Sequence, residues 1–185
     1  MTLWLARHAQ PLIKKGVCYG QLDVPADLAD TQKCAQALAG VLPIGALLVT
    51  SPLQRCEQLA PVLIALRPDL TVKKDARLQE MHFGQWEGRA WAAIDPAELA
   101  AWTDNFAHYR AGGTGESVAQ FMARVAQAFD ALDRTTTRDN IWLTHAGVIR
   151  AARLIAQGIR HINRASQWPL DAPAYGQWCK LELTT

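Results

Sequence analysis

Short apolar runs alternate with amphipathic stretches along this chain. The runs at residues 3–6, 46–50 and 140–144 are long enough for buried strands but too short for helices. Between them, apolar residues recur every three or four positions, which is typical of helices that cover a sheet. This alternation predicts a three-layer α/β/α sandwich with a mostly parallel mixed sheet. At this length we expect a single domain, residues 1–185.

The same pattern sets limits for each element. Strands are expected from Leu3 to the pair Arg7 and His8, and over residues 46–50, 70–73, 140–144 and 177–183, the last at a sheet edge. Helices are expected in a segment with Cys34, Leu38, Val41 and Leu42 on one face, over residues 53–66, 95–109 and 118–132, and after Gly147. Residues 10–27 and 77–88 contain turn-forming Pro or Gly and are predicted as loops.

Two of the expected helices begin with recognisable caps. Ser51 and Pro52 are typical of an N-cap followed by the first helical position. Ser117 and Gln120 have the spacing of a capping box. The helix expected over residues 95–109 stands outside the alternation of strands and helices, so it is either a lid over a site or a core-packing helix.

Basic side chains follow three of the predicted strands. Arg7 and His8 end the first strand, Arg55 lies in the first turn of the helix after the second, and His145 follows a later one. Because the carboxyl ends of parallel strands lie at one edge of a sheet, these groups can converge. The helices that start after Ser51 and His145 would add backbone N–H donors. Two guanidinium groups and two imidazoles suit a doubly charged oxyanion such as a phosphoryl group.

Five segments carry these residues or lie between them in the chain. They are Arg7-His8-Ala9, residues 51–56, residues 80–88, Gly115-Glu116-Ser117 and residues 144–150. In this order they resemble the motifs of the histidine phosphatase superfamily, most closely its phosphoglycerate-mutase-like branch. Within that branch, residues 18–25 and 83–88 resemble the α-ribazole phosphatases of cobalamin assembly. The resemblance implies a phosphoglycerate-mutase-like fold.

The resemblance also implies a role for each of five residues. His8 would attack phosphorus to give a phosphohistidine, while Arg7, Arg55 and His145 hold the phosphoryl oxygens. Glu80 would protonate the leaving oxygen and then act as a base toward water. That role needs Glu80 to be partly protonated near neutral pH, which burial would favour. No metal and no cofactor is expected, because the arginines supply the positive charge.

The chain departs from the family pattern close to the nucleophile. Ala9 stands where members usually have Gly, and Pro11 replaces a Thr or Ser whose hydroxyl can help to bind phosphate. Residues 26–31 also differ from the usual Leu-Thr-x-x-Gly-x-x-Gln segment. These differences bear on the substrate more than on the chemistry, since the five central residues are intact.

Further residues are candidates for the wall of a substrate pocket. They are Gln10, Tyr19, Gln21, His82, Trp86 and Ala146. For Tyr19, Gln21 and Trp86, packing is an equally good interpretation, and Glu116 is better explained as part of a helix start than as a ligand contact. Cys56 lies on an apolar helix face, which indicates a buried thiol rather than a nucleophile.

Composition limits the partners and the cellular compartment that we expect for this protein. A formal charge of +2 with 19% charged residues argues against a broad nucleic-acid surface. Four cysteines without CxxC spacing indicate reduced thiols. No secretory signal or membrane-spanning run is apparent, so a cytoplasmic protein that binds a small-molecule phosphomonoester is expected, with no nucleic-acid or membrane partner. The sequence carries no signal of oligomeric state.

The leading hypothesis is a metal-independent phosphomonoester hydrolase that acts through phosphohistidine, with α-ribazole 5′-phosphate as a candidate substrate. One alternative is a small-sugar or phosphoglycerate-type phosphatase with the same site. Another is a catalytically silent module that binds a phospholigand, which the changes at Ala9 and Pro11 would permit. The presence of Glu80 favours an enzyme, because binding alone needs no proton donor.

Overall fold

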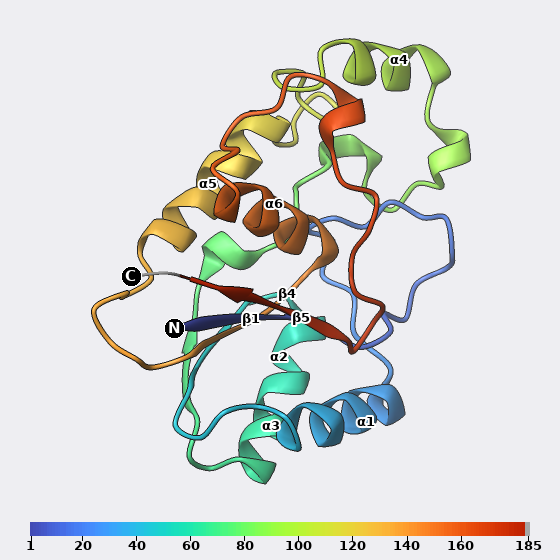
Figure 1. Cartoon of the computed structure of the whole chain (residues 1–185). Helices are drawn as coiled ribbons and strands as arrows, with labels where there is room; N and C mark the ends of the chain where they lie inside the picture. The colour runs from blue at the N-terminus through green and yellow to red at the C-terminus, as the bar shows by residue number, and fades with distance from the viewer. Residues whose placement is uncertain (184–185) are drawn as a thin grey trace.

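In the computed structural model, which describes residues 1–183, the strands form one sheet in the order β3-β2-β4-β1-β5 (Figure 1). The strands are β1 (Thr2–Arg7), β2 (Leu47–Thr50), β3 (Thr71–Lys74), β4 (Asn140–Thr144) and β5 (Trp178–Glu182). Only β5 runs antiparallel, against β1 at the sheet edge. The predicted mixed, mostly parallel sheet is therefore confirmed, and each strand lies within two residues of its expected limits.

Helices cover both faces of the sheet (Figure 1). On one face lie α1 (Leu28–Ala39) and α3 (Leu59–Leu66), and on the other α5 (Val118–Asp130) and α6 (Ala146–Ala156). Strand β1 shows why: Trp4 and Ala6 belong to the apolar cluster under α1 and α3, whereas Leu3 and Leu5 belong to the cluster under α5 and α6. Alternate residues of a strand point to opposite faces, so a run that is apolar throughout is buried on both sides. The three-layer prediction is confirmed.

The capping box is present at the start of α5. The Ser117 hydroxyl accepts from the Gln120 amide at 3.2 Å, and the Ser117 amide donates to the Gln120 side chain at 2.9 Å. The predicted cap at Ser51 is wrong. The helix there begins at Gln54 as α2 (Gln54–Glu57), with Leu53 at the N-cap, while Ser51 Oγ accepts from the Leu53 amide at 3.4 Å.

The helix expected over residues 53–66 is divided into α2 and α3. Gln58 lies between them with helical backbone angles, so the chain continues in the same direction. Pro61 lacks the N–H group that would donate to the Glu57 carbonyl, and this interrupts the regular hydrogen bonding. The division keeps Arg55 in the first turn of its own short helix.

Two other helices are shorter than predicted. Helix α1 ends at Ala39, so Val41 lies beyond it and is 44% exposed, in contrast to the expected apolar face. Helix α4 (Pro96–Asp104) ends before Phe106 and Tyr109. Both aromatic rings still pack inward, Phe106 against Trp102 with ring centroids 5.4 Å apart. Thr, Asp and Asn at residues 103–105 are weak helix formers, which explains the early end of α4.

The long loops are held against the body of the protein. An antiparallel bridge joins Pro11 to Ala26, and another joins Val17 to Ala90. The loop predicted over residues 77–88 contains the 3₁₀ turn η2 (Gly84–Trp86) and follows η1 (Ala76–Leu78); the other short turns are η3 (Trp91–Ala93) and η4 (Ala165–Gln167). The first and last described residues lie side by side, since the Leu183 amide donates to the Met1 carbonyl at 3.0 Å.

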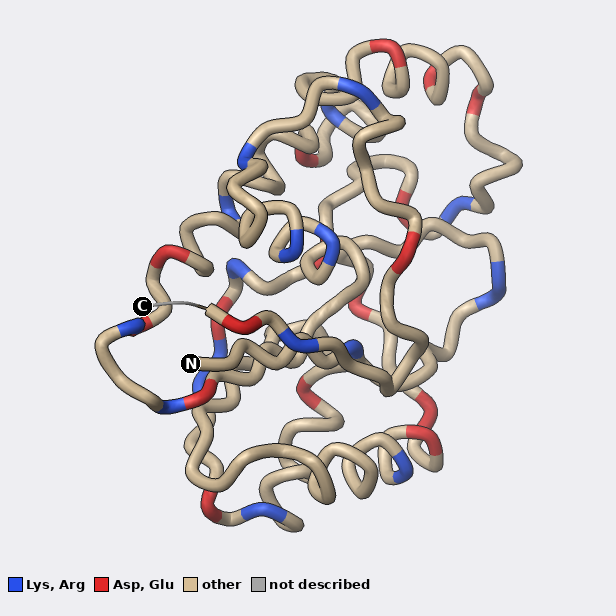
Figure 2. The backbone as a smooth tube through the Cα atoms, in the orientation of Figure 1, with Lys and Arg blue, Asp and Glu red and all other residues tan. Residues whose placement is uncertain are grey.

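Charged residues are distributed over the whole chain. Figure 2 shows basic and acidic positions interspersed along it, in keeping with the small net charge. Within residues 1–183, no helix is both long enough and apolar enough to cross a membrane.

Candidate active site

Four basic side chains meet where β1 and β4 end. Arg7 pairs in register with Thr144, which places His8 beside His145 with ring centroids 5.1 Å apart. Arg55 reaches the same place from α2, and its Nε donates to His145 Nδ1 at 3.3 Å. We call Arg7, His8, Arg55 and His145 the phosphoryl centre.

His8 is held in one protonation state and one tautomer. The residue is 2% exposed, and Nδ1 lies 2.7 Å from the Ala9 carbonyl oxygen. Because a carbonyl only accepts, Nδ1 carries the proton and Nε2 keeps a free lone pair. Burial, together with the charges of Arg55 and Arg7, lowers the pKa of His8 to about 3. The imidazole is therefore neutral at physiological pH and suited to act as a nucleophile.

The departures at Ala9 and Pro11 fit the backbone around His8. Ala9 is fully buried, and in residues 1–183 no residue other than glycine has a positive φ angle. The extra methyl group therefore causes no left-handed strain, and the Ala9 carbonyl is the group that sets the His8 tautomer. Pro11 lies in the bridge to Ala26, which fixes the start of the long loop.

Arg55 is rigid and completely buried. Besides His145, its guanidinium donates to the carbonyls of Leu22 at 3.0 Å and Gly20 at 2.7 Å. Arg7 donates to the Pro173 carbonyl at 2.9 Å, and its buried Nε has no partner among the described residues. Within residues 1–183, neither arginine forms an ion pair with a carboxylate. Two uncompensated cations beside a neutral imidazole make this centre attractive to an anion.

His145 contacts other residues of the site through both ring nitrogens. Nδ1 accepts from Arg55, so Nε2 carries the proton and donates to Ser51 Oγ at 2.8 Å. Burial and the charge of Arg55 hold the pKa of His145 well below its ordinary value. In this arrangement both ring nitrogens are occupied and His145 orients Arg55, so the phosphate-holding role that the resemblance implies stays a prediction. Cys56 lies nearby as a fully buried thiol, with its pKa raised to about 12 by burial.

Glu80 lies at the N-terminus of α6. Its carboxylate accepts from the Gly147 amide at 2.9 Å and from the Met81 amide at 3.0 Å. Glu80 is partly buried in this position. Gly147 permits the contact, because a Cβ atom there would lie 2.2 Å from Glu80 Oε1.

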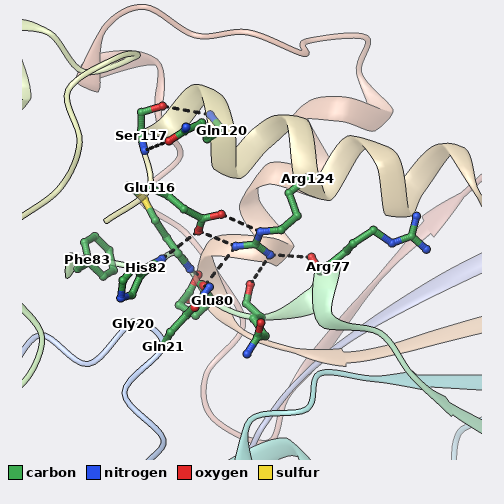
Figure 3. A network of polar contacts seen from close by, with 12 residues as sticks. Gly20, Gln21, Arg77, Glu80, His82, Phe83, Glu116, Ser117, Gln120 and Arg124 are labelled. Carbon is green, nitrogen blue, oxygen red and sulfur yellow. Dashed lines mark hydrogen bonds and ion pairs between the residues drawn. The ribbon is translucent and has the colours of Figure 1, made fainter. Parts of the chain in front are cut away.

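A network of polar contacts fixes the segment that carries Glu80 (Figure 3). Arg124 on α5 donates to the carbonyls of Gln79 at 2.9 Å and Glu80 at 3.3 Å, and it pairs with Glu116 at 2.7 Å. Glu116 also accepts from the His82 amide at 3.0 Å. Glu116 is thus a structural support and not a simple helix start. Arg124 was missed, because a lone arginine in a helix carries no signal of its tertiary partner.

Three of the predicted pocket residues lie near the phosphoryl centre. Gln21 donates from its side chain to the Glu80 carbonyl at 3.0 Å, which joins the first long loop to the Glu80 segment. The Tyr19 ring lies 5.2 Å from the Arg55 guanidinium. Ala146 is the first residue of α6 and follows His145 directly.

Of the other three pocket candidates, Trp86 lies in the core, while Gln10 lines a cavity of about 340 Å³ together with Tyr19 and Tyr175; the pocket role of Gln10 and His82 stays a prediction. The Trp86 side chain is completely buried in an aromatic cluster and donates to Glu98, so it belongs to the core. The hydrogen bonds that His82 forms with other described residues come from its backbone. Gln10 is exposed, and its side-chain amide donates to the Pro11 carbonyl at 3.4 Å.

Tyr175 belongs to the centre, although the sequence did not indicate it. Its ring lies 3.9 Å from the Arg7 guanidinium and 5.5 Å from the His8 ring. Its hydroxyl forms a hydrogen bond of 2.9 Å with the Tyr19 hydroxyl, so two loops meet over the centre. The Gly176 amide donates to the His8 carbonyl at 3.0 Å as the chain enters β5. Only this antiparallel return of the chain places Tyr175 beside residues far earlier in the sequence.

A cavity of about 270 Å³ opens beside Glu80. Its lining is mostly apolar and comes from the Glu80 segment, α4, α5, α6 and the residues around η4. The lining residues are Glu80, Met81, Phe83, Trp102, Thr103, Phe106, Val118, Phe121, Gly147, Arg150, Ala165, Trp168 and Leu170.

Comparison with known proteins places the chain in a family. The model of the histidine phosphatase superfamily (branch 1) matches residues 3–184. The chain is 36% identical over 110 residues to the glucosyl-3-phosphoglycerate phosphatase of Mycobacterium tuberculosis, a match covering 56% of this chain and about half (48%) of that protein. It is 29% identical over 195 residues to the phosphatase of the same name from Mycolicibacterium vanbaalenii, covering 97% and 83% of the two chains.

Solved structures show the same architecture. The mycobacterial glucosyl-3-phosphoglycerate phosphatase in complex with VO3 superimposes with a TM-score of 0.80 at 26% identity, covering 98% of this chain and 90% of the other. A protein from Thermus thermophilus superimposes with a TM-score of 0.72 at 28% identity, covering 98% and 94%.

Proposed function

This chain belongs to the histidine phosphatase superfamily (branch 1), and on that premise we propose that it is a metal-independent phosphomonoester hydrolase acting through a phosphohistidine on His8. The observation that carries the proposal is the hydrogen bond from His8 Nδ1 to the Ala9 carbonyl. It leaves a neutral Nε2 lone pair beside Arg7 and Arg55, the combination that attack on a phosphate dianion requires.

The reaction then proceeds in two steps. In the first, His8 Nε2 forms a bond to phosphorus while the bond to the ester oxygen breaks, and a protonated Glu80 gives its proton to that oxygen. In the second, water attacks the phosphohistidine, Glu80 takes a proton from the water, and His8 is released as neutral imidazole. Arg7 and Arg55 stabilise the phosphoryl oxygens in both steps, and the Gly147 amide holds Glu80 at the leaving-group side.

Turnover of an aryl phosphate in the presence of a chelator tests this mechanism. We expect His8→Ala to lose at least about a thousandfold in kcat, and Glu80→Gln to lose about a hundredfold or more with an alkyl phosphate. His108→Ala is the matched control, because His108 is exposed and outside the site. Loss of wild-type turnover on adding chelator would refute the metal-free mechanism.

Labelling with a radioactive phosphate ester tests the intermediate directly. We expect an acid-labile, base-stable label on the wild type that is absent from His8→Ala. A label of the same kind on His8→Ala would place the nucleophile elsewhere. A protein that binds phosphate or vanadate but turns over no ester would instead be the silent binding module.

Two substrates are proposed for the first screen. α-Ribazole 5′-phosphate is supported by the resemblance of residues 18–25 and 83–88, and residues 18–25 include Tyr19 and Gln21 of the site. Glucosyl-3-phosphoglycerate is supported by the relatives and solved structures that carry this substrate in their names. We expect kcat/KM values for the two to differ by about tenfold or more, and the higher value identifies the class.

A further inference from the structure

The cavity beside Glu80 borders the proposed general acid of the reaction. Glu80 and Gly147 line it, and the same two residues form the hydrogen bond that holds the acid in place. Any group bonded to the ester oxygen that Glu80 protonates would enter the space next to this carboxylate. The position of the cavity therefore makes it a site for the alcohol part of the substrate.

Five of the thirteen lining residues are aromatic. Trp168 packs against Phe106 and Phe121, with ring centroids 6.5 and 6.2 Å apart, and Trp102 packs against Phe106 at 5.4 Å. Such walls bind flat apolar rings by stacking and by release of water. A volume of about 270 Å³ is close to the lower end of the range for small-ligand sites, which suits a ring system of modest size.

The lining contains one acid, one base and few uncharged polar groups. Glu80 and Arg150 attract one another electrostatically, and burial lowers the pKa of Arg150. Arg150 Nη2 donates to the Leu170 carbonyl at 2.7 Å, whereas its buried Nε has no partner among the described residues. The uncharged polar groups of the lining are the Thr103 hydroxyl and the indole N–H groups of Trp102 and Trp168. A sugar with many hydroxyl groups would lose its water here without gaining equivalent partners, at a cost for each unpaired group.

We propose that this cavity binds the leaving group, and that the preferred substrates are phosphomonoesters whose alcohol carries a flat ring system. The inference rests on the proposed function, since it assumes that Glu80 faces the ester oxygen. It selects a substrate class: ring-bearing alcohols above polyhydroxylated or carboxylated ones.

Three alkyl phosphates of similar leaving-group basicity provide the test. They are naphthylethyl phosphate, glycerol phosphate and phosphoglycerate, so differences in kcat/KM report on binding of the alcohol part. We expect the wild type to favour naphthylethyl phosphate by about tenfold or more over the other two. Trp168→Ala should reduce kcat/KM for naphthylethyl phosphate about tenfold and change the glycerol phosphate value by less than about twofold. A preference for phosphoglycerate would overturn the inference and make Arg150 a carboxylate-binding residue.

Trp178→Ala is the matched control, because Trp178 is a half-buried tryptophan on β5, outside the cavity. Trp168→Leu keeps apolar bulk and should lose about threefold with the naphthylethyl ester, which separates loss of stacking from misfolding. Equal losses for all three substrates in Trp168→Ala would also overturn the inference.

Binding of the free alcohol separates this inference from the proposed function. In calorimetry, naphthylethanol should bind His8→Ala protein as well as wild type, and Trp168→Ala should weaken it about tenfold. If no ester is hydrolysed but the alcohol binds in this way, the proposed function fails and the cavity assignment stands. If ester hydrolysis depends on His8 but the alcohol does not bind, the cavity assignment fails alone.

Discussion

The phosphoryl centre and the cavity beside Glu80 are adjacent but differ in the types of side chain that form them and in how those side chains are held. In the centre, His8, Arg55 and His145 are almost completely buried, and each ring or guanidinium is held by hydrogen bonds to the protein. The cavity is lined mainly by aromatic and aliphatic side chains with one acid and one base. Glu80 and Gly147 form the border between the two regions.

In the proposed mechanism, this difference gives the two regions separate roles: the phosphoryl centre carries out the reaction, and the cavity selects the substrate. Rigid donors in a water-poor environment stabilise charge that is common to every phosphate ester. An apolar cavity can distinguish only the part of the substrate that varies. Substitutions in the centre should therefore affect all substrates alike, whereas substitutions in the cavity should affect them unequally. Each prediction below tests this division.

After His8→Ala, the largest effect is expected for Arg55→Lys. A lysine cannot keep the bonds to His145, Leu22 and Gly20 together, so we expect kcat/KM to fall about a hundred- to a thousandfold for every ester. The measurement is the ratio of kcat/KM values across the three alkyl phosphates, which should remain as in the wild type. Arg138→Lys, on an exposed arginine, is the control. A loss of kcat/KM confined to one substrate would contradict the separate roles of the phosphoryl centre and the cavity.

Gly147→Ala should have the next largest effect. The added methyl group displaces the Glu80 carboxylate, so we expect kcat for alkyl phosphates to fall about ten- to a hundredfold with little change in KM. Aryl phosphates should suffer less, because their leaving groups need less protonation. Gly40→Ala provides the control, since its Cβ would meet no atom closer than 3.7 Å. An unchanged kcat would show that Glu80 does not act from its observed position.

Tyr175 tests whether the aromatic cover of the centre serves all substrates. Tyr175→Ala removes the ring over Arg7, and we expect a fall of about three- to tenfold in kcat/KM for each ester. Tyr175→Phe keeps the ring and loses only the hydroxyl bond to Tyr19, so its values should stay within about threefold of wild type. If the Phe variant is as impaired as the Ala variant, the hydroxyl pair and not the ring is the important contact.

The smallest effect concerns stability and involves only the centre. The pKa of His8 is about 3 in the folded protein and has its ordinary value near 6.5 in the unfolded chain. The folded state binds fewer protons, so the free energy of unfolding falls as pH drops below about 6.5 and continues to fall toward pH 3. Between about pH 7.5 and 5.5, His8 alone should account for a loss of roughly 1.4 kcal/mol.

Urea unfolding of wild type and His8→Gln over this pH range measures the effect. The variant should show a correspondingly smaller decline in stability toward low pH, while His108→Gln, on an exposed histidine, should behave as wild type. His145 acts in the same direction, because its pKa is also lowered by burial. An identical pH dependence in wild type and His8→Gln would show that the His8 ring is not neutral in the folded protein.

The chain pattern predicted those features that depend on neighbours in sequence. The strands at residues 3–6, 46–50 and 140–144 and the capping box at Ser117 follow from local periodicity and spacing. The predicted cap at Ser51 was wrong, because the helix begins at Gln54 with Leu53 at its N-cap. The predicted apolar position of Val41 was wrong, because α1 ends at Ala39 and Gly40 is its C-cap.

The phosphoryl centre and the cavity beside Glu80 also differ in how far the sequence predicted them. The sequence by itself determined the fold class and the four basic residues of the phosphoryl centre, because the carboxyl ends of parallel strands meet at one edge of a sheet. Only the tertiary structure decided that Trp86 is core, that Tyr175 covers Arg7, that Arg124 supports Glu80, and that aromatic residues enclose a cavity. These contacts join segments that are remote in the chain, and their energy comes from burial and packing that no local pattern records.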